Sequence, residues 1–312
     1  MDAAGMKGPV TLIDIGTNTF EYLIAKYDAQ SYEIIDQGKI PVWLGKGGIV
    51  DGIIQEDALD RAEVALKDIA GRSKKLRSKK IIAVATSATR DASNSYHLND
   101  FAEELGFELR VIEGDEEAAL IQEGTSLGLP KDFPDHLIMD IGGGSTEFIQ
   151  VQNGKVLWKR SFDIGVTRLL ERIKPSDPLT PIDSDRIRLH IRAILAPLRQ
   201  QITDNPVSIL LGSAGSFDSL VEMLHASEKL NSKEGLVRID LGLFGATDAN
   251  LRSSSIKDRQ QMEGLIPMRS TTMHLATFMI AEVVQMTKVS SIIRSPFALK
   301  EGMLKRVMQE SS

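Results

Sequence analysis

An internal repeat of a strand–turn–strand unit constrains the fold of this chain more than any other feature. The segments "LIDIGTNTFEYLI" and "IMDIGGGSTEFIQ" each have an apolar pair, then Asp-Ile-Gly, then small polar residues and a glutamate that leads into a second strand. Their aspartates, Asp14 and Asp140, are 126 residues apart (140 − 14). A repeat of this size predicts two similar domains that face each other across a cleft. The alternative is a chance similarity between two such units.

Strands alternate with helices after each copy of the repeat. Apolar residues at helical spacing predict an amphipathic helix over residues 54–76, and a long helix is expected from about Ser184 to Thr203. Strand–helix alternation predicts an α/β fold with mixed sheets and flanking helices. We place the domains at 1–118 and 119–312, with the option that the last helix packs back on the first domain.

Composition excludes several classes of function. The 312 residues are 42% hydrophobic, include no cysteine and carry a net charge of −6. Disulfides and thiolate metal sites are therefore excluded, and a broad surface for a nucleic acid polymer is disfavoured. The N-terminus lacks the pattern of a signal peptide, and no apolar run approaches the roughly 20 residues that span a bilayer. We expect a cytoplasmic protein with no membrane partner.

Three turns of small residues, at 16–19, 142–146 and 212–216, can present backbone N–H groups to an anion. Glycine allows the required conformation and lets a phosphate approach closely. The third turn opens a helix, whose N-terminus adds partial positive charge. The candidate phosphate-binding residues are Thr17, Asn18, Thr19, Gly142, Gly143, Gly144, Ser145, Thr146, Gly212, Ser213 and Gly215.

Two aspartates precede the first two of these turns. Asp14 and Asp140 are candidate metal ligands, because Mg²⁺ prefers one or two carboxylates together with phosphate oxygens and water. If the two halves are pseudo-symmetric, these carboxylates would face each other across the cleft. The alternative is that each aspartate caps its own loop.

The order and spacing of five motifs resemble one known family. The motifs are "DIGTNTF", "VATSATRDASN", "VIEGDEEAALI", "DIGGGSTEF" and "LLGSAGS". They resemble the exopolyphosphatase / guanosine pentaphosphate phosphohydrolase (Ppx/GppA) family of the acetate and sugar kinase, Hsp70 and actin superfamily. The resemblance implies two actin-like (ribonuclease H-like) domains and hydrolysis of a terminal phosphoryl group from polyphosphate or guanosine pentaphosphate. It also implies Mg²⁺ or another divalent cation as cofactor, and it suggests a homodimer.

The resemblance also implies roles for individual residues. Glu117 matches the glutamate that orients and deprotonates the attacking water, and Arg90 matches an arginine that reaches the scissile phosphate. Asp140 and Glu147 match residues that bind or orient Mg²⁺. The sequence itself places Glu117 in the first turn of a helix directly after a strand. There, Glu116 and Glu117 could instead serve only to complement the helix dipole.

Four positions depart from the family pattern. Trp43 and Ala119 stand where arginines are usual, and Thr271 and Pro296 stand where aspartates are usual. Fewer arginines mean less positive charge for a polyanion, so the choice between polyphosphate and guanosine pentaphosphate stays open. Two other functions also stay open: a kinase or ATPase of the same superfamily, and a non-catalytic sensor of polyphosphate or a guanosine alarmone.

Overall fold

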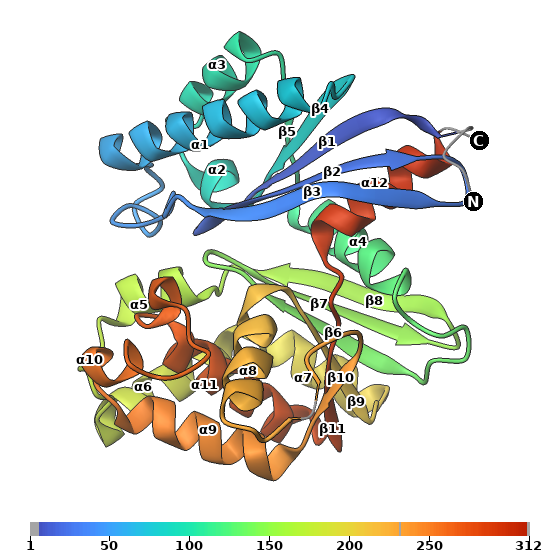
Figure 1. The fold of residues 1–312 in the computed structure, drawn as a ribbon. Coiled ribbons are helices and arrows are strands. Elements are labelled where there is room, and N and C mark those ends of the chain that lie inside the picture. The colour runs from blue at the N-terminus through green and yellow to red at the C-terminus, as the bar shows by residue number, and fades with distance from the viewer. Residues whose placement is uncertain (1–5, 231, 311–312) are drawn as a thin grey trace. The chain divides into compact units, whose positions relative to one another are not determined.

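The chain forms two compact units (Figure 1). The first comprises the chain up to Gly124 together with the segment from Leu299 onward, and the second runs from Thr125 to Ala298. The computed structural model describes residues 6–230 and 232–310. The α/β class that the sequence predicts, with two units of mixed sheets and flanking helices, is confirmed.

The unit boundary differs from the expected one at residue 118. Helix α4 (Gly114–Ser126) runs through that position without a break, so the first unit extends to Gly124. The last helix, α12 (Leu299–Gln309), belongs to the first unit. It contacts β1 and β2 of that unit's sheet.

Over the described residues, the first unit has a five-stranded sheet in the order β3-β2-β1-β4-β5. The strands β1, β2 and β3 are antiparallel neighbours, and β4 and β5 extend the sheet in parallel with β1. The strands are β1 (Lys7–Ile15), β2 (Thr19–Tyr27), β3 (Tyr32–Pro41), β4 (Lys80–Ala85) and β5 (Glu108–Val111).

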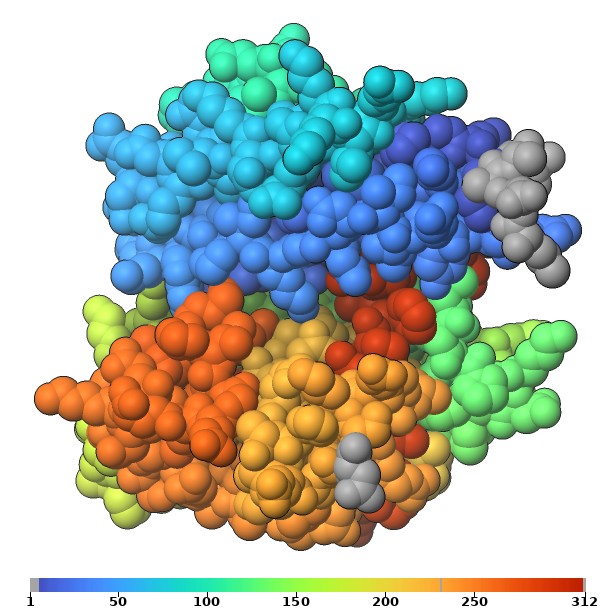
Figure 2. All heavy atoms as spheres, in the orientation of Figure 1, coloured from blue at the N-terminus to red at the C-terminus, as the bar shows by residue number. Residues whose placement is uncertain are grey.

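Helices of the first unit enclose its core. Helix α1 (Glu56–Lys75) buries Ala58, Ala62 and Leu66, which recur at helical spacing, and its opposite face forms the light-blue surface in Figure 2. The short helix α2 (Ser87–Asp91) follows β4, and α3 (Tyr96–Glu104) follows α2.

The second unit has, among its described residues, a six-stranded sheet in the order β10-β11-β9-β6-β7-β8. The strands are β6 (His136–Ile141), β7 (Thr146–Gln152), β8 (Lys155–Phe162), β9 (Ile209–Ser213), β10 (Val237–Ile239) and β11 (Ser291–Arg294). Its helices are α5 (Val166–Ile173), α6 (Pro181–Ile194), α7 (Ala196–Asp204), α8 (Ala214–Ala226), α9 (Leu241–Ser253), α10 (Ile256–Arg259), the 3₁₀ turn η1 (Pro267–Arg269) and α11 (Met273–Thr287).

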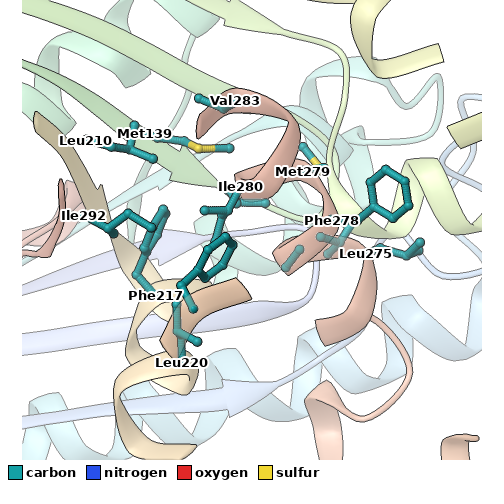
Figure 3. Packing of buried hydrophobic residues seen from close by; sticks show 14 of the residues in the cluster. Met139, Leu210, Phe217, Leu220, Leu275, Phe278, Met279, Ile280, Val283 and Ile292 are labelled. Carbon is teal, nitrogen blue, oxygen red and sulfur yellow. The ribbon is translucent and has the colours of Figure 1, made fainter. Parts of the chain in front are cut away.

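A buried apolar cluster joins the sheet and helices of the second unit. Leu210 of β9, Phe217 of α8 and Ile280 of α11 belong to it and are each 0% exposed. Figure 3 shows them from close by. Because all six strands and most helices of the unit contribute to one cluster, the strand ends and helix N-termini next to it are held in fixed positions.

The internal repeat is present in the strand topology of both units. In each sheet the first three strands are antiparallel neighbours, and the fourth, β4 or β9, joins the first in parallel. Asp14 pairs in register with Glu21, and Asp140 pairs with Glu147. The repeat is therefore structural, and chance similarity of sequence does not account for it.

The prediction of a single long helix from about Ser184 to Thr203 is wrong. The structure has two helices there, α6 and α7, which are separated at Leu195. Pro197 lies in the first turn of α7. Its ring lacks an N–H and would clash with a preceding carbonyl in a continuous helix, whereas a first turn accommodates it.

Glu21 is held by two lysines within the first unit. Lys39 Nζ lies 2.9 Å from one carboxylate oxygen and Lys300 Nζ lies 3.1 Å from the other, and the glutamate side chain is 13% exposed. Burial alone would raise the pKa of the Glu21 carboxyl, but attraction to Lys300 and then to Lys39 lowers it from 4.5 to about 2. The contribution of this carboxylate to stability is therefore present above pH 4.5 and is lost as the pH falls toward 2.

This predicts a specific pH dependence. We expect the difference in free energy of unfolding between the wild type and Glu21→Gln to shrink as the pH falls below 4.5, because the Glu21 carboxylate then takes up a proton in the unfolded chain while it stays ionised in the folded protein. Urea unfolding of both proteins from neutral pH to about pH 3 measures it. A difference that stays constant over this range would contradict the assignment.

Among the residues that the structure describes, no helix is both long and apolar enough to cross a membrane.

Candidate active site

The loop between β6 and β7 is a tight turn of the second unit. The Gly142 N–H donates to the Ser145 carbonyl over 3.0 Å, which brings the two strand ends together. Ser145 is 2% exposed. The turn follows Asp140 by one residue, so strand and turn place the carboxylate and the loop backbone next to each other.

The N-terminus of α5 fixes the direction of the loop peptides. The Val166 N–H donates to the Gly142 carbonyl over 3.0 Å, and the Thr167 N–H donates to the Gly143 carbonyl over 2.9 Å. The Arg168 Nε donates to the Gly144 carbonyl over 2.8 Å. A trans peptide directs its C=O and its N–H to opposite sides. The N–H groups of residues 143–145 therefore point away from α5 as three consecutive donors, which suits a phosphate.

Gly165 makes this arrangement possible. A Cβ atom there would lie 2.4 Å from the carbonyl carbon and oxygen of Gly143 and 2.5 Å from the Gly144 nitrogen. Only a glycine can therefore precede α5 at this distance from the loop. The sequence analysis missed Gly165 and Arg168. A signal was present, because Gly165 ends a third Asp-Ile-Gly triplet at residues 163–165.

Thr146 serves the loop in a different way from the predicted one. Its side chain is 0% exposed, and its hydroxyl donates to the Ile164 carbonyl. That bond ties the start of β7 to the segment before Gly165. The structure thus gives the Thr146 hydroxyl a partner in the protein, which leaves the backbone N–H groups as the candidate phosphate-binding groups of this loop.

Four polar side chains form a row across the sheet of the second unit. Ser213, Asp140, Glu147 and Ser161 occupy paired positions on the adjacent strands β9, β6, β7 and β8. The Ser213 hydroxyl donates to Asp140 over 2.6 Å, and the Ser161 hydroxyl donates to Glu147 over 2.6 Å. Residues in register lie on the same face of a sheet. The row therefore presents two neighbouring carboxylates, whose exposed fractions are 7% and 1%.

These two carboxylates fit a divalent cation. Mg²⁺ is commonly held by one or two carboxylates, with phosphate and water completing its shell. The equivalent row of the first unit differs, because Lys39 stands opposite Glu21 and binds its carboxylate. In the first unit, the Lys39 ammonium group therefore already offsets the negative charge of Asp14 and Glu21. The donor set of Asp140 and Glu147 is thus the better match for a metal. No group of three or more His, Asp or Glu side chains with metal-site geometry occurs within residues 6–230 and 232–310.

The third predicted turn lies at the junction of β9 and α8. A Cβ atom on Gly212 would meet the Phe217 ring at 2.0 Å, so this glycine is required by packing. A Cβ atom on Gly215 would lie 1.8 Å from a guanidinium nitrogen of Arg269. That guanidinium also donates to the Ser216 hydroxyl over 3.4 Å. The dipole of α8 repels a cation at its N-terminus. An anion bound there would be attracted both by the Arg269 guanidinium and by the helix dipole.

In the first unit, backbone N–H groups of a neighbouring segment likewise fix the direction of the peptides in the loop between β1 and β2. The Gly16 N–H donates to the Thr19 carbonyl over 3.1 Å, and the Asn18 carbonyl accepts from the N–H groups of Val42 and Trp43 over 3.0 and 2.9 Å. The N–H of Thr19 is consequently directed away from residues 42–43. Trp43 adopts a left-handed φ of 58°, which is rare for a bulky residue. The position where the sequence departs from the family is thus part of the segment that fixes residues 17–19.

Arg90 and Glu117 meet in the first unit. Arg90 lies in the last turn of α2, and Glu117 lies in the first turn of α4. A terminal nitrogen of Arg90 lies 3.3 Å from Glu117 Oε2 and donates to the Ile112 carbonyl over 3.0 Å. The two side chains are 14% and 8% exposed. The structure thus pairs the two residues that the sequence analysis named as catalytic, and their solvent-accessible atoms are few.

The predicted residues are thus grouped within each unit. In the first, Arg90 pairs with Glu117, and Asp14 is the next-to-last residue of β1, the strand that leads into the loop of residues 17–19. In the second, Asp140 and Glu147 lie beside the loop of residues 142–145.

Comparison with known proteins identifies the family of this chain. The model of the Ppx/GppA phosphatase family matches residues 23–311. An exopolyphosphatase from Cytophaga hutchinsonii is 33% identical, with 97% of this chain and 99% of that chain covered and a TM-score of 0.92.

Two more distant structures share the fold. A Ppx/GppA family member from Aquifex aeolicus is 22% identical, covers 98% of this chain and 99% of that chain, and has a TM-score of 0.79. An exopolyphosphatase-like protein is 23% identical, covers 97% and 99%, and has a TM-score of 0.86. The family match includes the loop of residues 142–145 and the Arg90–Glu117 pair, and the Cytophaga relative covers nearly the whole chain. This chain belongs to the Ppx/GppA phosphatase family.

Proposed function

We propose that the chain hydrolyses the terminal phosphoanhydride bond of inorganic polyphosphate or guanosine pentaphosphate and releases orthophosphate. Family membership supports phosphohydrolase chemistry. The observation that carries the proposal is the Glu117 carboxylate, which is nearly buried, fixed in the first turn of α4 and paired with Arg90 over 3.3 Å. A general base and a guanidinium in contact are the two groups that water attack on a phosphoryl group needs.

Glu117 would take the proton of the attacking water. The water oxygen then bonds to the terminal phosphorus while the bond from that phosphorus to the bridging oxygen breaks. The shortened chain leaves with the bridging oxygen, and the terminal phosphoryl group becomes orthophosphate. Arg90 would offset negative charge on the phosphoryl oxygens, since charge spreads over them in the transition state. Its second bond, to the Ile112 carbonyl, holds the guanidinium in place for this role.

The second unit would supply groups that bind phosphate and metal. The backbone N–H groups of residues 143–145 suit phosphate oxygens, because α5 has turned them outward. Asp140 and Glu147 would hold Mg²⁺ or another divalent cation. When bound, such an ion neutralises charge on phosphoryl oxygens. The metal role of Asp14 stays a prediction.

Phosphate release from four substrates in parallel tests the proposal. Wild-type protein with Mg²⁺ is incubated with long polyphosphate, triphosphate, guanosine pentaphosphate and ATP. We expect release from polyphosphate or guanosine pentaphosphate to exceed release from ATP, because these two are the substrates that the family resemblance implies. ATP also ends in a phosphoanhydride, so it measures whether the enzyme discriminates between chains that share this bond. Turnover of ATP alone would indicate a kinase or ATPase, and tight binding of polyphosphate without release across several divalent cations would indicate a sensor. Either result would overturn the proposal.

A further inference from the structure

The last helix of the chain lies directly on the helix that carries Glu117. A Cβ atom on Gly302 of α12 would lie 1.9 Å from the carbonyl oxygen of Leu120 in α4 and 2.7 Å from its carbonyl carbon. Figure 1 shows the red ribbon of α12 beside the green ribbon of α4 within the first unit. Leu120 follows Glu117 by three residues, so the contact is less than one helical turn from the proposed base.

Arg306 joins the same two helices through its whole guanidinium group. Its Nε and one terminal nitrogen lie 2.8 and 3.0 Å from the two carboxylate oxygens of Glu123. The other terminal nitrogen lies 3.1 Å from Glu116. Glu116 and Glu123 are seven residues apart and therefore occupy one face of α4, on both sides of Leu120. A planar fork that binds two points along a helix restricts its rotation as well as its distance.

The other end of α12 is anchored to the sheet. Lys300 Nζ lies 3.1 Å from Glu21 of β2 and 3.2 Å from Glu301, and the lysine side chain is 11% exposed. Met303 and Leu304 of α12 are 4% and 0% exposed. Since Glu21 pairs in register with Asp14, this anchor lies on the strands that lead into the loop of residues 17–19. The helix α12 thus connects that loop's strands to α4.

We infer that Arg306 is a positioning residue for catalysis. It fixes the rotation of α4 about its axis, and this rotation sets the position of the Glu117 carboxylate relative to Arg90. Glu117 is turned about 100° from Glu116 around the helix. A rotation of α4 that releases Glu116 from Arg306 therefore also moves Glu117. The inference rests on the proposed role of Glu117 as the base.

A purely structural role for the same contacts makes a different prediction. Arg306 is 32% exposed, and ion pairs with this much exposure contribute little to stability. A structural role therefore predicts a slightly lower melting temperature and an unchanged turnover. Positioning predicts lower turnover with little change in substrate binding, because misplacement by about 1 Å can lower a rate about 100-fold.

The test compares Arg306→Ala and Arg306→Lys with a matched control, Arg72→Ala. Arg72 is also a partly exposed arginine of the first unit, and it lies 2.9 Å from Asp68 and 3.5 Å from Asp36. We expect Arg306→Ala to lower kcat about 10-fold or more with KM within about twofold, since the base moves while the phosphate-binding groups stay. Arg306→Lys should have a higher kcat than Arg306→Ala, because lysine keeps the positive charge. Its kcat should stay below that of the wild type, because an ammonium group cannot bind both glutamates as the planar guanidinium does. Arg72→Ala should stay within about twofold of the wild type.

Two further measurements separate the possible outcomes. In a Glu117→Gln background, Arg306→Ala should cause no further loss of the residual rate, because its effect passes through that side chain. Amide hydrogen exchange should become faster in α4 in Arg306→Ala and stay unchanged in α1. An active wild type whose kcat is unaffected by Arg306→Ala would overturn the inference, as would an equal loss in Arg72→Ala. A wild type that releases no phosphate from any substrate refutes the proposed function instead, and unchanged exchange in α4 would then also refute the positioning role.

Discussion

Glu117→Gln is expected to lower kcat by about three orders of magnitude, the middle of the range for loss of a general base. Glutamine has the size of glutamate and can still accept the hydrogen bond of Arg90, so α4 and α2 should keep their positions. What it lacks is the ability to take a proton from water. Phosphate release under saturating substrate measures kcat, and calorimetric titration of the same substrate measures binding.

The matched control is Glu104→Gln, which removes an exposed carboxylate at the end of α3 in the same unit. It should leave kcat within about twofold, since surface charges away from the site have small effects. Retained turnover in Glu117→Gln would exclude Glu117 as the base. Loss of turnover together with loss of substrate binding and a lowered melting temperature would show that the residue has a structural role instead.

Gly165→Ala is expected to abolish most activity from a position that contributes no side chain. The new methyl group would lie 2.4 Å from the Gly143 carbonyl, and both groups belong to the backbone, so the loop or α5 must move. Displacement of about 1 Å at a phosphate-binding group can cost about 100-fold in rate. Overpacking of this kind also costs about 1–3 kcal/mol of stability. We therefore expect kcat/KM to fall at least about 100-fold and the melting temperature to fall as well.

Gly245→Ala provides the opposite expectation in the same unit. Gly245 lies in α9, is exposed, and has no atom within 4 Å of the position that a Cβ would take. Alanine should stabilise this helix by about 0.5–1 kcal/mol and leave activity unchanged. If Gly165→Ala behaved like Gly245→Ala in both thermal unfolding and phosphate release, α5 would not be the element that orients the loop.

The sequence alone predicted the parts of the site that lie within one strand–turn–strand segment. Asp140 and the turn of residues 142–145 were predicted as candidates because a repeated pattern of apolar, acidic and small residues marks the strand end and the turn, and the family resemblance added Glu147 on the next strand. Their placement on one face follows from the alternation of side chains along strands. The family resemblance added Arg90 and Glu117, whose pairing the structure shows.

One missed feature is local, and two others depend on residues that are far apart in the chain. Pro197 was visible in the sequence, yet the break at Leu195 between α6 and α7 was not predicted, because the apolar spacing continues across it. Gly165 resembles many other glycines until the loop of residues 142–145 is placed against it. Arg306 is one basic residue in a terminal amphipathic helix until its two carboxylate partners are known.

The sequence by itself determined the two strand–turn–strand units, the alternation of strands and helices, and the residue types at each strand end, because these depend on local periodicity and on glycine. The tertiary structure alone decided which way the loop peptides point, since their carbonyls are fixed by N–H groups of α5 and of residues 42–45. It alone placed the last helix on α4, where a glycine and an arginine fit the carbonyl and carboxylates of a helix nearly 200 residues earlier. Such contacts follow from the packing of whole elements, which no local pattern specifies.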